Sequence, residues 1–121
     1  ALAALTTTIH VSLVGYAGML DAARQSWDKG HYLANRLVQS DHVVIGGTAP
    51  FWCEFPVVFD SVERMEHVLR ALKEQGIHGG VRLGPMTDNQ SDASVLIVAV
   101  TEKRTKAEID AYVAILREVL G

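Results

Sequence analysis

The side chains able to act as nucleophiles or metal ligands are scattered along this chain. Its 121 residues include five histidines and one cysteine. No two histidines stand four residues apart, the spacing at which one helix presents two ligands to a zinc ion. Cys53 falls on the apolar face of a predicted strand, where a small core residue is expected. The sequence therefore predicts no metal centre and no cysteine nucleophile.

Two glycine pairs could turn backbone N–H groups toward an anion. They are Gly46-Gly47, and Gly79-Gly80 with Arg82 close behind. Neither pair has the lysine and the serine or threonine of a phosphate-binding loop. A tight turn beside a strand is therefore the favoured interpretation of both.

The charged residues form no general acid–base pair. Lys103 and Arg104 stand between Glu102 and Glu108, which is typical of a solvated turn. Acidic residues elsewhere lie on a predicted strand or in a loop, and the sequence places no two of them together in contrasting environments. The residues alone show no catalytic group and no cofactor site. The candidates for contact with a ligand are Glu54, His78, Gly79, Gly80 and Arg82.

The elements that would position these residues are clearest near the C-terminus. Val95–Val100 is an uninterrupted apolar run rich in β-branched residues, which predicts a strand buried on both faces. Thr105 and Glu108 form a capping box, T-x-x-E, at the start of a helix. One face of that helix carries a regular apolar stripe, made of Ile109, Val113, Leu116 and Leu120.

The middle of the chain predicts one more helix and three further strands. Asp60 and Glu63 resemble a capping box, and Gly76 is the expected C-cap of a helix over residues 60–75. Pro56 cannot donate to a ladder, so the strand that contains it is expected to be an edge or to have a bulge there. The predicted strands are His42–Ile45, Phe51–Phe59 and, weakly, Ile77–Leu83, with a polar loop over Gly84–Asp92.

Residues 1–40 are predicted to form leading helices. Leu2–Val14 is an uncharged helix, Gly15–Gly18 interrupts it, and a second helix runs from about Met19 to Gln39. Scattered threonines, a serine and a histidine disfavour a membrane span. A helix made for burial in protein is favoured instead, and a chain that opens on one looks like a piece of something larger. Gly30, inside the second helix, indicates close packing or a bend.

Size, charge and element order limit the fold and the class of partner. A chain of 121 residues fits one domain, residues 1–121. The net charge of −3 gives no reason to expect nucleic acid or an anionic membrane as partner. A single cysteine excludes an internal disulfide and fits a reducing cytoplasm. The predicted fold is α/β (α+β): a two-layer sandwich in which helices cover mainly one face of a mixed or mostly antiparallel sheet of about four strands.

Several segments resemble glycine dehydrogenase (decarboxylating) subunit 1, the first half of the split P-protein of the glycine cleavage system. The run Thr101–Asp110 is similar to the C-terminal signature of that family. Phe51–Phe55 and Gly76–Gly84 resemble its aromatic strand and its Gly-Gly turn. His31–Ala34 and Ala4–Gly15 resemble its linking helices. The resemblance spans nearly the whole chain.

The resemblance implies a small C-terminal domain of a fold-type I pyridoxal-phosphate enzyme. In such enzymes the lysine that forms the aldimine typically follows a histidine in the large domain, and none of the lysines here follows a histidine. The resemblance thus implies that the chain alone binds no cofactor, is inactive, and serves in assembly. Its partners would be glycine dehydrogenase subunit 2 or the large domain.

Two further expectations concern association and an alternative function. The uncharged N-terminal helix is expected to pair with a copy of itself and give a homodimer. The alternative to an enzyme fragment is a free-standing binding or protein-interaction module, using the edge at Gly79, Gly80 and Arg82. A coding region upstream of Ala1 would favour the fragment, and a start codon there would favour the module.

Overall fold

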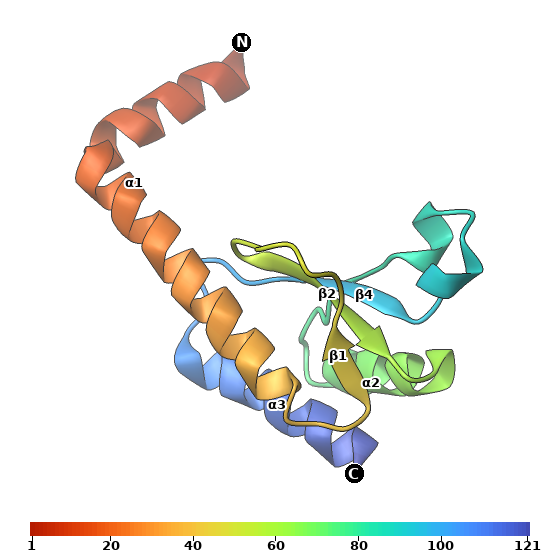
Figure 1. The fold of residues 1–121 in the computed structure, drawn as a ribbon. Coiled ribbons are helices and arrows are strands. Elements are labelled where there is room, and N and C mark those ends of the chain that lie inside the picture. Colours follow the sequence, from red (N-terminus) through yellow and green to blue (C-terminus); the bar gives the residue numbers. More distant parts are fainter.

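The computed structural model describes residues 1–121 as three helices and one four-stranded sheet (Figure 1). The strands lie in the order β1-β2-β4-β3, and every neighbouring pair is antiparallel. The helices are α1 (Leu2–Leu37), α2 (Val62–Glu74) and α3 (Lys106–Leu120), and the strands are β1 (Val43–Ile45), β2 (Glu54–Phe59), β3 (Val81–Arg82) and β4 (Val95–Ala99). The predicted α+β sandwich is confirmed.

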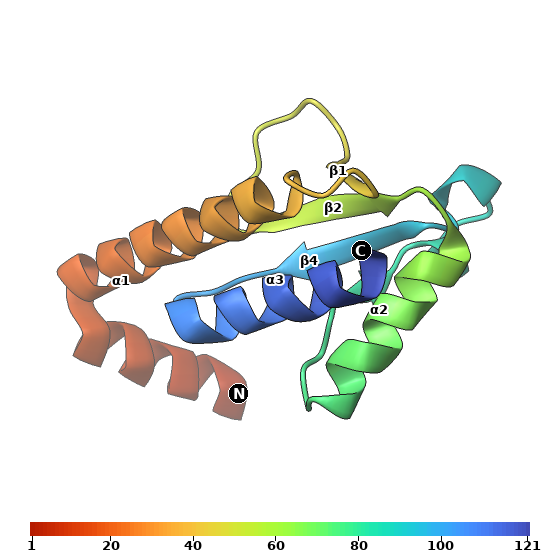
Figure 2. The ribbon, with the colours of Figure 1, turned by 90° about the horizontal axis from the view of Figure 1, so that it is seen from below.

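The sheet contains one crossover, made by α2. Strands β2 and β3 are both antiparallel to β4, so they are parallel to each other with β4 between them. Helices α2 and α3 lie side by side on one face of the sheet, and the C-terminal half of α1 lies along α3 (Figure 2). The core lies between these helices and that face. Its fully buried large side chains are Leu37, Phe55, Met65, Leu72, Leu96 and Leu116.

The other face of the sheet carries no helix (Figure 1). In β4, Leu96 and Val98 point to the helices and are buried, whereas Ile97 is half-buried and Ala99 is exposed. The predicted burial on both faces therefore holds at Val95, which is buried on the outer face, and fails at Ile97 and Ala99. An apolar run indicates that its residues prefer burial. In this chain, helices cover only one face of the sheet.

Helix α1 is broken at one residue. Gly15 has φ 67° and ψ 177°, a conformation that glycine adopts readily and other residues do not, while Gly18 stays helical. The predicted interruption is confirmed at Gly15 only. The break sends residues 1–14, here called the N-terminal arm, away from the rest of the molecule (Figure 1).

Gly30 marks the point where α1 approaches the chain just before β2. A Cβ atom on Gly30 would lie 3.0 Å from the Cα of Cys53, so the predicted close packing is confirmed. Three rings form a stack nearby. The His31 ring lies between those of Trp27 and Phe51, with centroid distances of 3.9 Å and 4.2 Å. The Phe51 ring also meets that of Phe55. These contacts hold residues 51–53 against α1, so β2 begins at Glu54 rather than at Phe51.

Strand β2 is internal, although it contains Pro56. The carbonyl oxygen of Pro56 accepts a 2.8 Å hydrogen bond from the N–H of Gly46, the first residue after β1. The missing N–H of Pro56 therefore points to the place where β1 ends. The predicted edge or bulge is corrected to an internal strand whose neighbour stops at the proline.

The caps of the two later helices differ in how well the sequence indicated them. The Thr105 and Glu108 capping box of α3 is present as predicted. At α2 the N-cap is Ser61, whose hydroxyl accepts from the N–H of Arg64. Asp60, predicted as the cap, instead lies one residue earlier and binds His42 and Arg64. Serine caps helices as well as aspartate does, and Ser61 stands next to Asp60 in the sequence.

Candidate binding site

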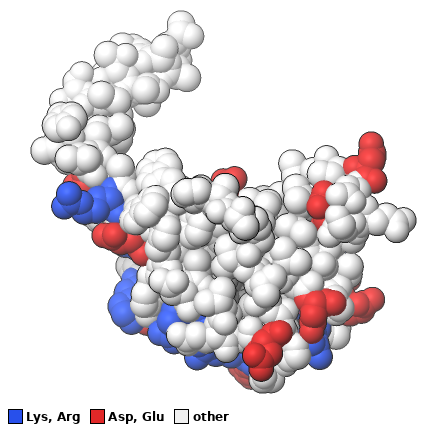
Figure 3. Space-filling view, in the orientation of Figure 1, with Lys and Arg blue, Asp and Glu red and all other residues white.

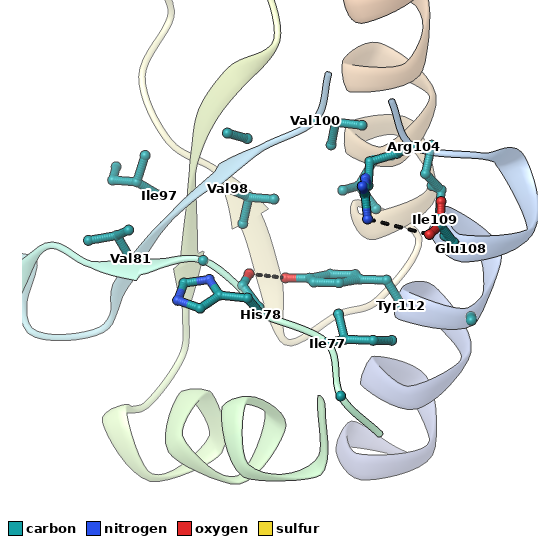
Figure 4. A pocket seen from close by; sticks show the side chains of 16 residues that line it. Ile77, His78, Val81, Ile97, Val98, Val100, Arg104, Glu108, Ile109 and Tyr112 are labelled. Atoms are coloured by element: carbon teal, nitrogen blue, oxygen red, sulfur yellow. Dashed lines mark hydrogen bonds and ion pairs between the residues drawn. The ribbon is translucent and has the colours of Figure 1, made fainter. Parts of the chain in front are cut away.

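A cavity of about 510 Å³ lies between the loop that follows α2, the end of β4 and the start of α3 (Figure 4). Ten of its 16 lining residues are hydrophobic. Strand β4 and the adjoining β3 supply Val81, Ile97 and Val98, and helix α3 supplies Ile109. Cavities of this size and character are typical of sites for small apolar groups.

The Gly79-Gly80 turn shapes one wall of the cavity because neither residue has room for a side chain. A Cβ on Gly79 would lie 2.7 Å from the Cδ1 of Leu72, and one on Gly80 would lie 2.6 Å from the carbonyl oxygen of Ile97. Gly80 also has φ +140°. The favoured interpretation of this pair, a tight turn beside a strand, fits this packing. The turn is anchored by the Tyr112 hydroxyl, which donates a 2.9 Å hydrogen bond to the carbonyl oxygen of Gly79.

Arg104, Glu108 and His78 are the ionisable residues that line the cavity besides Tyr112. One Glu108 oxygen accepts from the Thr105 N–H at 2.7 Å and from its hydroxyl at 3.0 Å. The hydrogen bond from the Thr105 backbone, followed by that from its side chain, lowers the pKa of Glu108. The other oxygen lies 3.4 Å from Nη1 of Arg104. This is the one polar contact that the guanidinium group makes in the chain. The guanidinium group is thus left with free donors at the cavity.

The hydroxyl of Tyr112 and the thiol of Cys53 are the groups in or near the cavity whose pKa values are raised. Burial raises the pKa of Tyr112, so its hydroxyl stays neutral and engaged with Gly79. Cys53 is half-buried outside the cavity, in the loop before β2 rather than on a strand as predicted. Burial, then the charges of Glu54 and Glu102, raise the pKa of its thiol, which disfavours the thiolate. The arrangement can bind a group.

The predicted ligand contacts separate into two sets. His78, Gly79 and Gly80 line the cavity together. Glu54 does not line it and is exposed at the start of β2. Arg82 also does not line it, and its guanidinium forms a 3.1 Å ion pair with Glu66 of α2. No group of three histidine, cysteine or acidic residues could hold a metal ion.

Sequence reasoning missed three polar residues of the cavity. Arg104 and Glu108 were interpreted only as a solvated turn and a helix cap, and Tyr112 was left out of the α3 stripe. Tyr112 follows Ile109 by three residues, so helical spacing alone would have placed it on the inner face. That Arg104 faces a cavity depends on the path of residues 76–80, which no local pattern indicated.

Comparison with known proteins gives a consistent set of relatives. No protein-family model matches the chain. Proteins named "Probable glycine dehydrogenase (decarboxylating) subunit 1" are similar to it: that of Chlorobaculum tepidum is 36% identical over 114 residues, and that of Chlorobium phaeobacteroides 41% over 116. That of Thermomicrobium roseum is 34% identical over 117 residues. The three matches cover 94%, 96% and 97% of this chain.

The chain spans about a quarter of the length of these relatives, 24% in the first two and 25% in the third. The same proportion holds for a solved structure, the crystal structure of glycine decarboxylase (P-protein) of the glycine cleavage system in an inhibitor-bound form. The TM-score is 0.75 and the identity 26%, over 93% of this chain and 24% of that one. Both comparisons therefore match one part of a much longer chain.

Proposed function

Because this chain is homologous over nearly all of its length to a C-terminal part of glycine dehydrogenase (decarboxylating) subunit 1, we propose that it works as the C-terminal domain of a glycine-decarboxylating P-protein and is inactive alone. The resemblance inferred from Thr101–Asp110 and the Gly-Gly turn is confirmed by these relatives. The observation that carries the proposal is coverage: the match takes in 94% of this chain and 24% of the relative from Chlorobaculum tepidum.

The four lysines of the chain do not fit a pyridoxal-phosphate site. Lys29 donates to the Glu102 carbonyl and to Gln25, and Lys106 binds Asp110. Lys73 and Lys103 are exposed, and no lysine lines the 510 Å³ cavity. A Schiff base to the cofactor needs a lysine amine held in a pocket. These residues therefore supply no attachment point, and we assign no step of the reaction to them.

The N-termini of α2 and α3 are also unsuited to the phosphate of such a cofactor. The first turn of α3 carries Glu108, and that of α2 carries Glu63 with Asp60 just before the helix. A helix N-terminus attracts an anion through free N–H groups and a positive dipole end. Here carboxylates and capping hydroxyls already occupy that role, so a phosphate would meet repulsion.

The test is an assay of glycine-dependent release of carbon dioxide with added pyridoxal phosphate. We expect no release by the chain alone. We expect activity to require the large domain of a homologous subunit 1 together with subunit 2, supplied as separate polypeptides. Carbon dioxide released from glycine by the chain alone would overturn the proposal.

The N-terminal arm is the surface through which this domain would join the rest of the assembly. Leu2, Leu5 and Leu13 are 78%, 57% and 82% exposed, and the arm carries no charged side chain (Figure 3). Its hydroxyls are satisfied internally, since Thr6, Thr7, Thr8 and Ser12 each donate to the carbonyl four residues earlier. A helix with apolar side chains and no free hydroxyl donor is suited to burial in protein.

The partner proposed for the arm is the large domain of a P-protein or glycine dehydrogenase subunit 2. When the chain is alone, a second copy takes that place and gives a homodimer. The domain is proposed to act in the cytoplasm, in keeping with its single free cysteine. It is proposed to have no membrane or nucleic-acid partner.

Helix α1 is long and apolar enough near its N-terminus to cross a membrane by length and composition. Its break at Gly15 argues against that role. Residues 2–14 would extend about 20 Å at the rise of an α-helix, whereas the hydrocarbon core is about 30 Å thick. The straight segment is therefore too short to span.

Light scattering at micromolar concentration tests the association. We expect a dimer for the native chain and a monomer for Leu5→Glu with Ile9→Glu, because both residues lie on the apolar stripe of the arm. Thr7→Glu adds charge off the stripe and should leave the dimer intact. A monomeric native chain would contradict the homodimer. In a pull-down with the immobilised chain, failure to capture either a P-protein large domain or subunit 2 would contradict the assembly role.

A further inference from the structure

The edge of β4 is paired with β3 only in part. The N–H of Leu83 donates to the carbonyl of Val95 at 2.9 Å, and Val81 pairs with Ile97. By the same register Ala99 would pair with Gly79, but the chain turns away at Gly80 and the Gly79 carbonyl accepts from Tyr112 instead. The N–H and carbonyl of Ala99 face this side of β4 and have no partner in the chain.

Strand β2 does not bind the N–H and carbonyl of Ala99, because successive residues of β4 direct their backbone groups to opposite neighbours. The N–H of Val100 donates to the carbonyl of Cys53, and the N–H of Phe59 donates to the carbonyl of Ser94. The even-numbered residues of β4 therefore face β2, and the odd-numbered residues face β3. Ala99 is odd-numbered and exposed, so its unpaired N–H and carbonyl are open to a partner.

The unpaired edge and the cavity are adjacent. Ala99, Ile97 and Val81 belong both to this edge of the sheet and to the cavity wall (Figure 4). Beyond them the cavity extends under the sheet toward Ile109 and Tyr112 of α3. A strand placed on the edge would alternately direct side chains into this apolar space and out to solvent.

Arg104 supplies a charge at the same place. Its side chain lines the cavity, remains 54% exposed and makes one contact, at 3.4 Å, with Glu108. That carboxylate is already engaged by Thr105 through its other oxygen. A guanidinium with free donors beside an apolar cavity is complementary to a carboxylate.

We propose that the open edge of β4 at Ala99 and the adjoining cavity bind an extended peptide segment that carries an aliphatic side chain and a carboxylate. The backbone of the peptide pairs with Ala99, the aliphatic side chain enters the cavity, and the carboxylate meets Arg104. This is recognition by addition of a strand, in which main-chain hydrogen bonds give affinity and a side-chain pocket gives selectivity. It does not depend on the function proposed above.

The probe is acetyl-Thr-Val-Thr-Val with a free C-terminal carboxylate, titrated into the ¹⁵N-labelled chain and followed by NMR. We expect saturable shifts at Ala99 and its neighbours and slower solvent exchange of the Ala99 N–H. The native chain should bind the C-terminal amide of this peptide more weakly than the acid. The Arg104→Gln chain should bind the acid and the amide equally weakly. Equal binding of acid and amide by the native chain would overturn the role of Arg104.

Backbone methylation tests the strand pairing without changing side chains. Only alternate N–H groups of an added strand face its neighbour, so one of two peptides, N-methylated on both threonines or on both valines, should lose binding. Loss of the backbone bonds should weaken binding about tenfold. If both methylated peptides bind as well as the unmodified one, the proposal is overturned.

The matched protein variants are Ala99→Pro and Ala99→Val. Proline removes the N–H that faces away from β2, so the chain should keep its circular dichroism spectrum and lose about tenfold in affinity. Valine keeps the N–H and should bind normally. Undiminished binding by a folded Ala99→Pro chain, or no saturable shift in the native chain, would overturn the proposal. Concentration-dependent protection of Ala99 without peptide would also overturn it, because a second copy would then occupy the edge.

Discussion

The hydroxyl of Tyr112 donates a 2.9 Å hydrogen bond to the carbonyl oxygen of Gly79, which joins α3 to the loop that follows α2. Tyr112 is only 6% exposed, so its hydroxyl is largely shielded from solvent. The bond fixes the turn that forms one wall of the cavity and that leaves Ala99 unpaired. Two residues 33 positions apart in the sequence thus meet at one wall of the site.

The substitution Tyr112→Phe tests this bond. It leaves the buried carbonyl of Gly79 without its donor, so we expect a loss of about 1–3 kcal/mol in the free energy of unfolding. Urea denaturation followed by circular dichroism measures it. Tyr16→Phe is the matched control, since Tyr16 is 84% exposed and should change nothing. A native-like midpoint for Tyr112→Phe would show that water or another group satisfies Gly79.

The substitution Gly15→Ala tests the break in α1. The φ of +67° at Gly15 is strained for alanine, by about 1–3 kcal/mol, and the arm makes no contacts that would hold the break in place. We therefore expect the arm to swing into line with the rest of α1. Small-angle scattering should show a longer maximum dimension. Tyr16→Ala, at an exposed residue next to the break, should leave the dimension unchanged.

The substitution Ser26→Ala tests how the turn after β4 is held on α1. Ser26 is 3% exposed, and its hydroxyl oxygen accepts from the N–H of Glu102 at 3.0 Å. Its loss leaves that N–H unpaired, so we expect a destabilisation of about 1–2 kcal/mol in thermal or urea unfolding. Ser12→Ala, in the exposed arm, is the control. Equal stability of the two variants would contradict this role for Ser26.

Acid should weaken the attachment of α3 to α1 through Asp110. Hydrogen bonds from Lys106 and then from Tyr32 lower the pKa of Asp110 below its ordinary 3.8. A pKa lowered in the folded state adds stability that is present above the ordinary value and is lost as pH falls through the folded one. The melting temperature of Asp110→Asn should therefore lie below that of the native chain at neutral pH and converge with it in acid.

The control for that comparison is Asp88→Asn, in the exposed loop before β4. Its melting temperature should follow that of the native chain at every pH. A difference in melting temperature between the native and Asp110→Asn chains that stays constant across the acid range would contradict this prediction. It would mean that the packing of Asp110, and not its charge, stabilises the fold.

What the sequence determined by itself was local. The capping box of Thr105 and Glu108 and the stripe from Ile109 to Leu120 use contacts within one or two helical turns. The break at Gly15 and the end of α2 at Gly76 are also visible locally, because a positive φ favours glycine. The similarity of Thr101–Asp110 to a known family extended this to the identity of the whole domain.

Only the tertiary structure decided the remaining features. That β4 is covered on one face, that Pro56 lies in an internal strand, and that Arg104 faces a cavity all depend on which segments pack together at a distance in sequence. Glu54 and Arg82 were grouped with His78 by residue type, and the fold separated them. Hydrophobic pattern fixes which residues prefer burial, whereas the partner that buries them, or leaves Ala99 open, is set by the path of the whole chain.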